Sequence, residues 1–360
     1  MPLNLQGPAL EAAKATPNGE AGEAEPIKVR QFFAPINGGI TARQCNMIQD
    51  ALAIEQLEAK AAGAIGYMVR TLAQATLPHL DPKLPDGMLY SRNTGLFTLT
   101  VAPTSPKHGI PYGSIPRIIM AWLCTEVILN KDSILSDRTV SLGNSQADFL
   151  NKLQMHNNGH DIKRFREQSL RLFKSVISIE YADDSRGDLS KRLLISEESN
   201  IFWHPSKLNQ HSPWESTLEL SKSFCQEIIK SSVPIDMRVY HALSKSPMAM
   251  DIYTWFTYRM FVVRHSGRPS VLIPWLGLKA QIGARYGEWP PKTDEPKDER
   301  QALYSFKSNF KKRFREVLNF YPEARDHIED TGDMLKLTPC KLHLPHCKAT
   351  KPVKLSDFRS

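Results

Sequence analysis

Apolar residues recur along much of this chain at spacings of three and four positions, the pattern of helices that pack by one face. The clearest case is residues 299–321. Its apolar side chains fall within one arc of a helical projection: Leu303, Phe306, Phe310, Phe314 and Val317. Six basic residues and two acidic ones stand between and beside them. The pattern predicts a helix that packs by its aromatic face and exposes cations on its other faces.

The same reasoning predicts further elements. Helices are expected at 41–76, 116–130, 145–153, 161–177, 236–243, 247–263 and 275–282, and Gly63 and Gly66 could divide the first of these in two. Short or alternating apolar runs predict strands at 95–101, 139–142, 176–181, 192–196 and 270–273. A hairpin is expected within 324–337, with its turn at Thr331 and Gly332.

The order of these elements suggests a repeated architecture. Between 116 and 196 it reads helix, strand, helix, turn, helix, hairpin, which is the order of a winged helix, and 236–337 repeats it without repeating the sequence. We therefore expect an α+β fold, mainly helical, with two tandem winged-helix domains. The expected segments are a disordered tail at 1–35, a helical N-terminal segment and linker at 36–90, winged-helix domains at 91–220 and 221–338, and a basic C-terminal tail at 339–360.

Composition adds a polyanionic partner to this picture. The chain has 360 residues, a formal net charge of +8 and a pI near 9.1, so its field favours encounters with nucleic acid or an acidic membrane surface. Its apolar runs are shorter than the ~20 residues of a membrane span, and no signal-peptide pattern begins the chain. We expect a cytoplasmic protein without membrane contact. Its five cysteines are scattered and odd in number, which favours reduced thiols.

Two predicted basic helices are candidates for DNA contact, because each follows a shorter helix as a recognition helix does. On the helix at 161–177 the face opposite the apolar residues carries Arg164, Gln168, Arg171 and Ser175. On the helix at 299–321 the outward positions are Gln301, Ser305, Ser308, Lys312 and Arg315, with Lys307 and Lys311 on the flank. An ordinary solvated surface is the alternative reading of each helix.

The sequence signals for metal-binding, base-stacking and catalytic residues are weak. Cys340, His343, His346 and Cys347 have a spacing compatible with zinc, but Pro345 interrupts them and no second such cluster exists, so we expect neither metal nor cofactor. The aromatic run at 253–261 favours a core over a base-stacking platform. The sequence contains no GxxxxGK[ST], GxSxG or HExxH motif, and we expect a protein that is not an enzyme.

Four blocks of the sequence resemble plasmid-encoded RepA replication initiators of the iteron type. They are GLFTLTVAP at 95–103, GIPYGSIPRIIMAWLCTEV at 109–127, VPIDMRVYHALSKSPMAMDIYTWFTYRM at 233–260 and FKSNFKKRFREVLNFYPEA at 306–324. The resemblance covers residues 59–338. It implies binding to repeated double-stranded sites in a plasmid origin, opening of the duplex, and recruitment of a host initiator protein and the replicative helicase. The implied DNA-binding residues are Lys163, Arg164, Arg166, Arg171, Lys174, Lys307, Ser308, Lys311, Lys312, Arg313 and Arg315.

Two alternatives remain at this stage. A transcriptional repressor would use the same winged-helix modules, and a nickase or primase would act on nucleic acid as an enzyme. A homodimer is also compatible with the sequence, with an interface in the 41–76 segment or in the first domain, although no heptad pattern selects one of them.

Overall fold

The computed structural model describes residues 41–85, 88–95, 97–105, 107–155, 161–181, 189–203, 210–212, 215–283 and 299–344. Within these residues the fold is mixed α and β and about half helical. The predicted disordered tail at 1–35 and most of the predicted tail at 339–360 lie outside them. We divide the fold into an N-terminal unit, from β2 to α7, and a C-terminal unit, from α8 to β12.

The N-terminal unit contains two antiparallel sheets. Its elements are β2 (Tyr90–Asn93), β3 (Thr98–Pro103), α3 (Ser114–Leu129), α4 (Lys131–Asp137), β4 (Thr139–Gly143), α5 (Gln146–Lys152), α6 (Asp161–Phe173), β5 (Ser175–Tyr181), β6 (Leu189–Leu194), β7 (Ser196–Asn200), β8 (Ser216–Leu220) and α7 (Lys222–Ser231). The sheet orders are β2-β3-β5-β6 and β4-β8-β7. The helices and strands predicted in this region are present with shifted bounds, since α6 ends at Phe173 and the predicted strand at 192–196 spans the end of β6 and the start of β7, whereas β2, α4, β8 and α7 were not predicted. However, β4 pairs with β8, whereas the β5–β6 hairpin pairs with β3.

The C-terminal unit has a simpler topology. Its elements are α8 (Met237–Ala242), α9 (Pro247–His265), β10 (Val271–Pro274), α10 (Trp275–Ile282), α11 (Glu299–Leu318), the 3-10 helix η2 (Pro322–His327), β11 (Ile328–Asp330) and β12 (Met334–Leu337). The sheet order is β10-β12-β11, so the last strand lies between the other two. The hairpin turns at Gly332, as the sequence predicts, with a φ of 97° that favours glycine.

The prediction of one long helical segment at 41–76 is wrong. The chain there forms α1 (Ala42–Glu55), β1 (Ile65–Val69) and α2 (Arg70–Gln74), and β1 pairs antiparallel with β9 (Ser232–Asp236). A short apolar run cannot be assigned to helix or strand by its periodicity alone. Gly66 permits the close approach of this strand to α8, since a Cβ atom there would lie 2.4 Å from Met237 Sδ.

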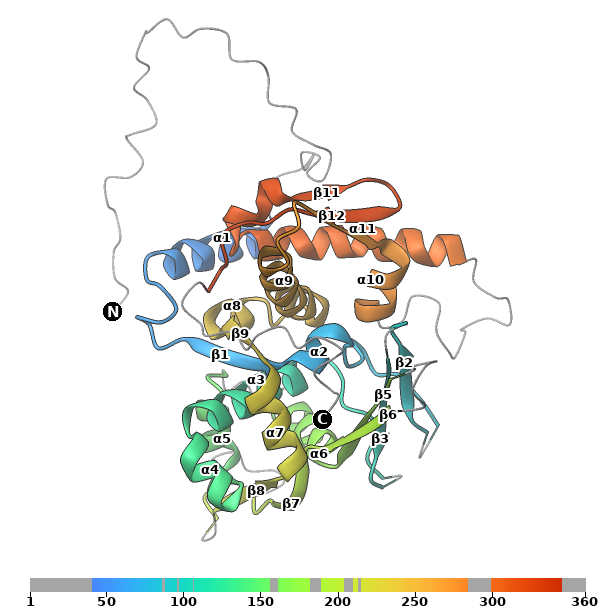
Figure 1. Ribbon diagram of the computed structural model, residues 1–360. Helices are drawn as coiled ribbons and strands as arrows, with labels where there is room; N and C mark the ends of the chain where they lie inside the picture. The colour runs from blue at the N-terminus through green and yellow to red at the C-terminus, as the bar shows by residue number, and fades with distance from the viewer. Residues whose placement is uncertain are drawn as a thin grey trace, which may run out of the picture.

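The aromatic helix α9 is the centre of the core. Figure 1 shows it below α11 and the β11–β12 hairpin, in orange and red, and above the N-terminal unit, with the blue α1 beside α11. Tyr253, Trp255 and Phe256 have no exposed surface, which confirms the predicted core role of this run. α9 packs directly against the candidate DNA-binding helix α11 and also against α3, which in turn packs against the second candidate, α6.

Two buried arginines join the units. Arg117 on α3 donates from Nε and Nη2 to the Asp251 carboxylate on α9, at 2.7 and 2.6 Å, and His79 Nε2 lies 2.7 Å from the same carboxylate. Arg92 on β2 donates to the carbonyl oxygens of Lys279 and Ala280, at 2.9 and 2.7 Å, and so satisfies the end of α10. These contacts fix the relative placement of the two units.

Candidate nucleic-acid interface

The aromatic face of α11 anchors this helix in the core. Phe306, Phe310 and Phe314 have no exposed surface, as the sequence predicts. The rings of Phe310 and Trp255 lie 6.1 Å apart at 84°, and those of Phe314 and Phe256 lie 4.9 Å apart at 69°, both edge-to-face. The opposite face of α11 is therefore held in a fixed direction.

That outward face is polar and contains a residue that the sequence analysis missed. Gln301, Ser308 and Lys312 are exposed, in agreement with their predicted positions. Tyr304 is 70% exposed and lies one turn before Ser308 on the same side. Its large apolar ring at an outward position of the helix is the signal that could have identified it. Arg315 is partly buried, and its Nε has no hydrogen-bond partner among the described residues.

Lys307 and Lys311 are held by the β11–β12 hairpin. Lys307 Nζ donates to the Gly332 carbonyl, and Lys311 Nζ pairs with the Asp330 carboxylate. Both ammonium groups also lie over the Trp275 ring, at 5.4 and 5.9 Å from its centroid. We call these five residues the hairpin brace.

Asp330 is the centre of the hairpin brace. Its Oδ1 accepts from Trp275 Nε1 at 2.9 Å and from the Gly332 backbone N–H at 3.0 Å. Burial alone would raise the pKa of Asp330, but hydrogen bonds from Lys311 and Trp275 outweigh it and hold the pKa below its usual value. The carboxylate therefore stays charged and offsets the charge of Lys311.

Arg313 is also paired. Its Nη1 donates to Glu316 Oε1 at 2.6 Å, and Arg43 on α1 donates to the other oxygen of the same carboxylate at 3.1 Å. Of the predicted contact residues on α11, Ser308, Lys312 and Arg315 thus lie outside the ion pairs described, while Lys307, Lys311 and Arg313 have partners within the fold.

The predicted outward face of α6 is partly wrong. Lys163 and Arg164 are exposed, and Arg166 and Lys174 are partly buried. Gln168, in contrast, is fully buried, and its Oε1 accepts from the Tyr112 backbone N–H at 2.8 Å. Ser175 is also fully buried and belongs to β5, because the helix ends at Phe173.

The contacts of Arg171 show that the loop at 109–112 packs against this face of α6. Its guanidinium donates to the Ile110 carbonyl at 3.2 Å and to Glu167 at 2.5 Å, and it lies 5.2 Å from the centroid of the Tyr112 ring. Gly109 leaves room for it, since a Cβ atom there would lie 2.8 Å from Arg171 Nη1. A helical projection cannot reveal that the loop at 109–112 covers this side of α6.

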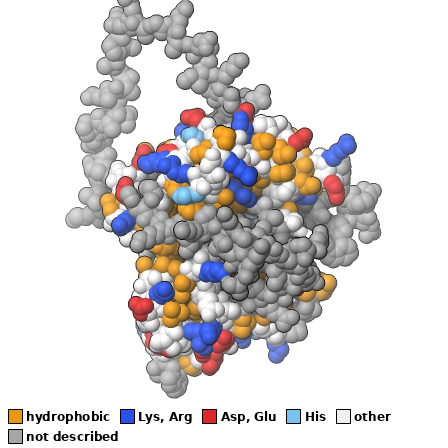
Figure 2. Space-filling model, in the orientation of Figure 1, with side chains coloured by type: hydrophobic (Ala, Val, Ile, Leu, Met, Phe, Trp, Pro, Cys, Tyr) orange, Lys and Arg blue, Asp and Glu red, His pale blue; other side chains and the backbone are white. Residues whose placement is uncertain are grey.

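Surface charge alone does not mark the interface. On the face shown in Figure 2, cations, carboxylates and apolar side chains are interspersed. The candidate interface therefore depends on particular positions along α6 and α11.

Among the described residues, no helix combines the length and apolarity needed to cross a membrane.

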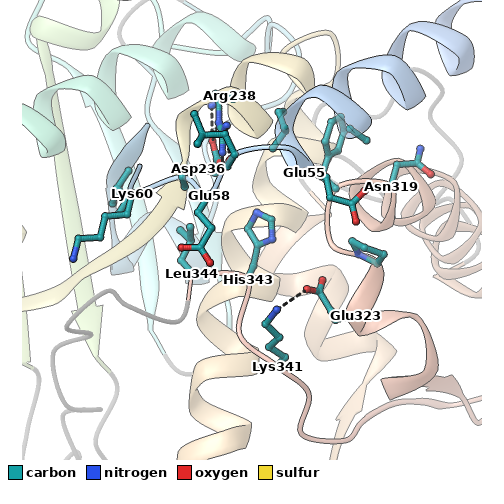
Figure 3. A pocket seen from close by; sticks show the side chains of 17 residues that line it. Glu55, Glu58, Lys60, Asp236, Arg238, Asn319, Glu323, Lys341, His343 and Leu344 are labelled. Carbon is teal, nitrogen blue, oxygen red and sulfur yellow. Dashed lines mark hydrogen bonds and ion pairs between the residues drawn. The ribbon is translucent and has the colours of Figure 1, made fainter. Parts of the chain in front are cut away.

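The C-terminal Cys and His residues form no metal site among the residues described. No group of three potential ligands is found there, and His346 and Cys347 lie outside the described residues. His343 lines a cavity of about 300 Å³ near the end of α1, together with the Glu323–Lys341 and Asp236–Arg238 pairs (Figure 3). The Cys340 thiol donates to the Lys341 carbonyl at 3.2 Å.

One family model matches part of the chain. Residues 110–276 match the family model described as plasmid encoded RepA protein. This region is somewhat less than half of the chain. It includes α6 and α9 and ends before α11. None of the curated proteins matches the chain.

Solved structures give a distant likeness. A crystal structure of domains 2 and 3 of RctB is 12% identical, with a TM-score of 0.44 over 75% of this chain and 96% of that chain. A second structure of the same RctB domains is 13% identical, with a TM-score of 0.37 over 76% of this chain and 98% of that chain.

Proposed function

We propose that this chain, whose residues 110–276 match the family model described as plasmid encoded RepA protein, is a replication initiator that binds repeated double-stranded sites in a plasmid origin. It would promote opening of the origin and recruit the host initiator protein and the replicative helicase. It would act as a monomer or as a homodimer.

The observation that carries the DNA-binding part of this proposal is the arrangement of α11. Its aromatic face is buried, its outward face presents Gln301, Tyr304, Ser308 and Lys312, and a three-stranded sheet of order β10-β12-β11 lies beside it. This order supports a winged helix, in which α10 precedes the recognition helix α11 and the β11–β12 hairpin is the wing. Polar and aromatic side chains of these kinds suit base edges and phosphates.

The N-terminal unit is proposed as a second winged-helix module with α6 as its DNA-contacting helix. Its order of elements supports this assignment, although α4 is inserted and β4 pairs with β8. Lys163 and Arg164 are the exposed cations on α6, and Arg166 and Lys174 are partly exposed. Arg171, held by the loop at 109–112, would position this helix more than it would touch DNA.

The experiment that tests the proposal is a double substitution, Lys312→Ala with Arg315→Ala. Binding to a duplex from the plasmid's own origin should weaken, and the slope of log affinity against log salt should fall in magnitude by about 1.8, since each lost phosphate contact removes ~0.9. The matched control is Lys131→Ala with Lys222→Ala, which removes two exposed cations on other elements.

Thermal stability should change little in both double variants, because Lys312 is exposed and Arg315 is in no ion pair among the described residues. An unchanged salt slope would contradict the assignment of α11. Footprinting across the plasmid would separate initiation from repression: protection of repeated sites in the origin supports an initiator, and protection of a lone operator supports a repressor.

A further inference from the structure

A cleft of about 790 Å³ opens between the two units, beside α6. Its walls come from α1, from the first turn of α3, from α8 and from the residues that begin α9. The cations Arg164, Arg238 and Lys245 line it, and Asp50 is the one carboxylate among its described lining residues. We call this feature the junction cleft.

The guanidinium of Arg164 lies beside the N-terminus of α3, and the two positive charges repel each other unless an anion binds between them. Gly113, the N-cap residue of α3, has a φ of 80° and provides no capping side chain. A Cβ atom on Gly113 would lie 3.3 Å from Arg164 Nη2, so the guanidinium lies close to this helix end. A helix N-terminus carries partial positive charge and disfavours a neighbouring cation. Arg164 makes no ion pair with any residue that the structure describes.

Lys245 is the second cation of the junction cleft without an ion pair, although the α9 N-terminus beside it is capped by the Ser246 side chain, which accepts from the Ala249 N–H. It is exposed and directly precedes Ser246, the N-cap residue of the 19-residue helix α9. No ion pair joins Lys245 to another residue in the described part of the chain. The Ser114 hydroxyl donates to the Ser244 carbonyl, which ties the beginnings of α3 and α9 together.

Arg238 differs from these two cations because its charge is already offset. Its guanidinium donates to the Asp236 carboxylate at 2.7 Å and to the Leu57 carbonyl at 2.9 Å. Arg238 therefore forms part of the wall of the junction cleft but adds no unpaired positive charge to it. The positive charge of the junction cleft without an ion-pair partner among the described residues comes from Arg164 and Lys245, beside the N-terminus of α3, which has no capping side chain.

We propose that the junction cleft binds a phosphate group, held between Arg164 and Lys245. A phosphate would offset both cations and the uncapped N-terminus of α3. Ile115, Ile118 and Met155 form an apolar part of the wall that suits a sugar or base attached to the phosphate. The phosphate can come from a free nucleotide or from the DNA backbone, and the second source rests on the proposed function.

The test uses the full chain with Lys245→Glu and Arg164→Glu, each compared with Lys222→Glu. Lys222 is an exposed lysine on α7 outside the junction cleft, so it controls for the change in net charge. The first probe is ATP, followed by the rise in melting temperature that binding produces. The second probe is a labelled duplex of arbitrary sequence, because phosphate contacts do not depend on base sequence.

For a nucleotide site, ATP stabilises the wild type and the Lys222→Glu control, and the two cleft variants need at least roughly tenfold more ATP for the same rise. For a backbone site, ATP has no effect, while Lys245→Glu, which removes no proposed α6 contact, binds the duplex more weakly and with a salt slope lower by about 0.9 or more than that of the control. The proposal is overturned if neither probe distinguishes Lys245→Glu from Lys222→Glu.

The two proposals fail separately. A wild type that binds the duplex while both probes treat cleft and control variants alike would remove the phosphate site and leave the initiator. A wild type that binds no duplex, but is stabilised by ATP through Lys245 and Arg164, would remove the initiator and leave the site.

Discussion

The three lysines of α11 differ in the groups that their ammonium groups contact. Lys307 and Lys311 reach the β11–β12 hairpin and the Trp275 ring, whereas Lys312, one residue further on, points to solvent. The sequence predicted the direction of each side chain correctly from helical spacing. It could not predict the partners, because Asp330 and Gly332 follow roughly twenty residues later and meet α11 only after the hairpin packs against it.

Substitution Asp330→Asn should strengthen binding to a duplex. The amide keeps an oxygen for Trp275 and Gly332 but loses the charge that pairs with Lys311, so Lys311 becomes available to a phosphate. We expect the magnitude of the salt slope to rise by about 0.9 in fluorescence anisotropy titrations. The control is Asp333→Asn, an exposed carboxylate on the same hairpin without an ion pair among the described residues.

If Asp330→Asn bound the duplex more weakly than the wild type, while Asp333→Asn bound it as the wild type does, this prediction would be contradicted. Lys311 would then act by holding the hairpin in place, and the ion pair would be needed for the shape of the interface.

At the scale of elements, α10 depends on a residue from the other unit. Arg92 is 2% exposed, and its guanidinium donates to the Lys279 and Ala280 carbonyls at the end of this eight-residue helix. Helix ends leave carbonyl groups without intrahelical partners. A distant arginine on β2 therefore helps to fix the helix that precedes α11.

Substitution Arg92→Met should destabilise the protein by roughly 2–4 kcal/mol, because it removes a buried guanidinium that bonds the partly buried Lys279 and Ala280 carbonyls and leaves the Lys279 carbonyl with the Gly283 N–H as its donor. Urea unfolding monitored by circular dichroism measures this loss. Arg268→Met, at an exposed arginine beyond α9, is the matched control and should change the free energy of unfolding by less than about 0.5 kcal/mol. Equal midpoints for the two variants would show that α10 does not need Arg92.

Sequence patterns predicted most helices of this fold, including α3, α9, α10 and α11, because long amphipathic or wholly apolar stretches have a clear period. They missed β1 and β9, which are five residues each. A strand of this length is defined by its partner, and here the partner lies more than 160 residues away along the chain. The loop at 109–112 that covers Gln168 and Arg171 was missed for the same reason.

At the scale of the whole molecule, the joined units should lose stability in mild acid. Burial lowers the pKa of His79 below 6.5, despite the Asp251 carboxylate beside it. The folded state therefore keeps His79 neutral while the unfolded state takes up a proton below pH 6.5. Stability falls as the pH drops from that value towards the folded pKa, by at most about 1.4 kcal/mol per pH unit for this group.

Substitution His79→Gln should flatten this dependence, because the amide can still donate to Asp251 and does not titrate. Urea midpoints measured from pH 7.5 to pH 5 provide the comparison. His343, whose pKa burial also lowers, should leave a residual slope in the variant. His265→Gln, at an exposed histidine at the end of α9, is the matched control for the loss of a histidine side chain. Identical profiles for His79→Gln and the wild type would exclude His79 as the source.

The β1–β9 pairing also determines where this chain can be divided. Residues 65–69 and 232–236 bracket the entire N-terminal unit, and Arg43 on α1 reaches Glu316 on α11. A fragment that begins after residue 220 would therefore expose an unpaired strand edge and lose the support of α1, which invites aggregation. A protease cut in the middle of the chain would not release two independent bodies. An isolated C-terminal module would need residues 41–69 supplied from the other end of the sequence.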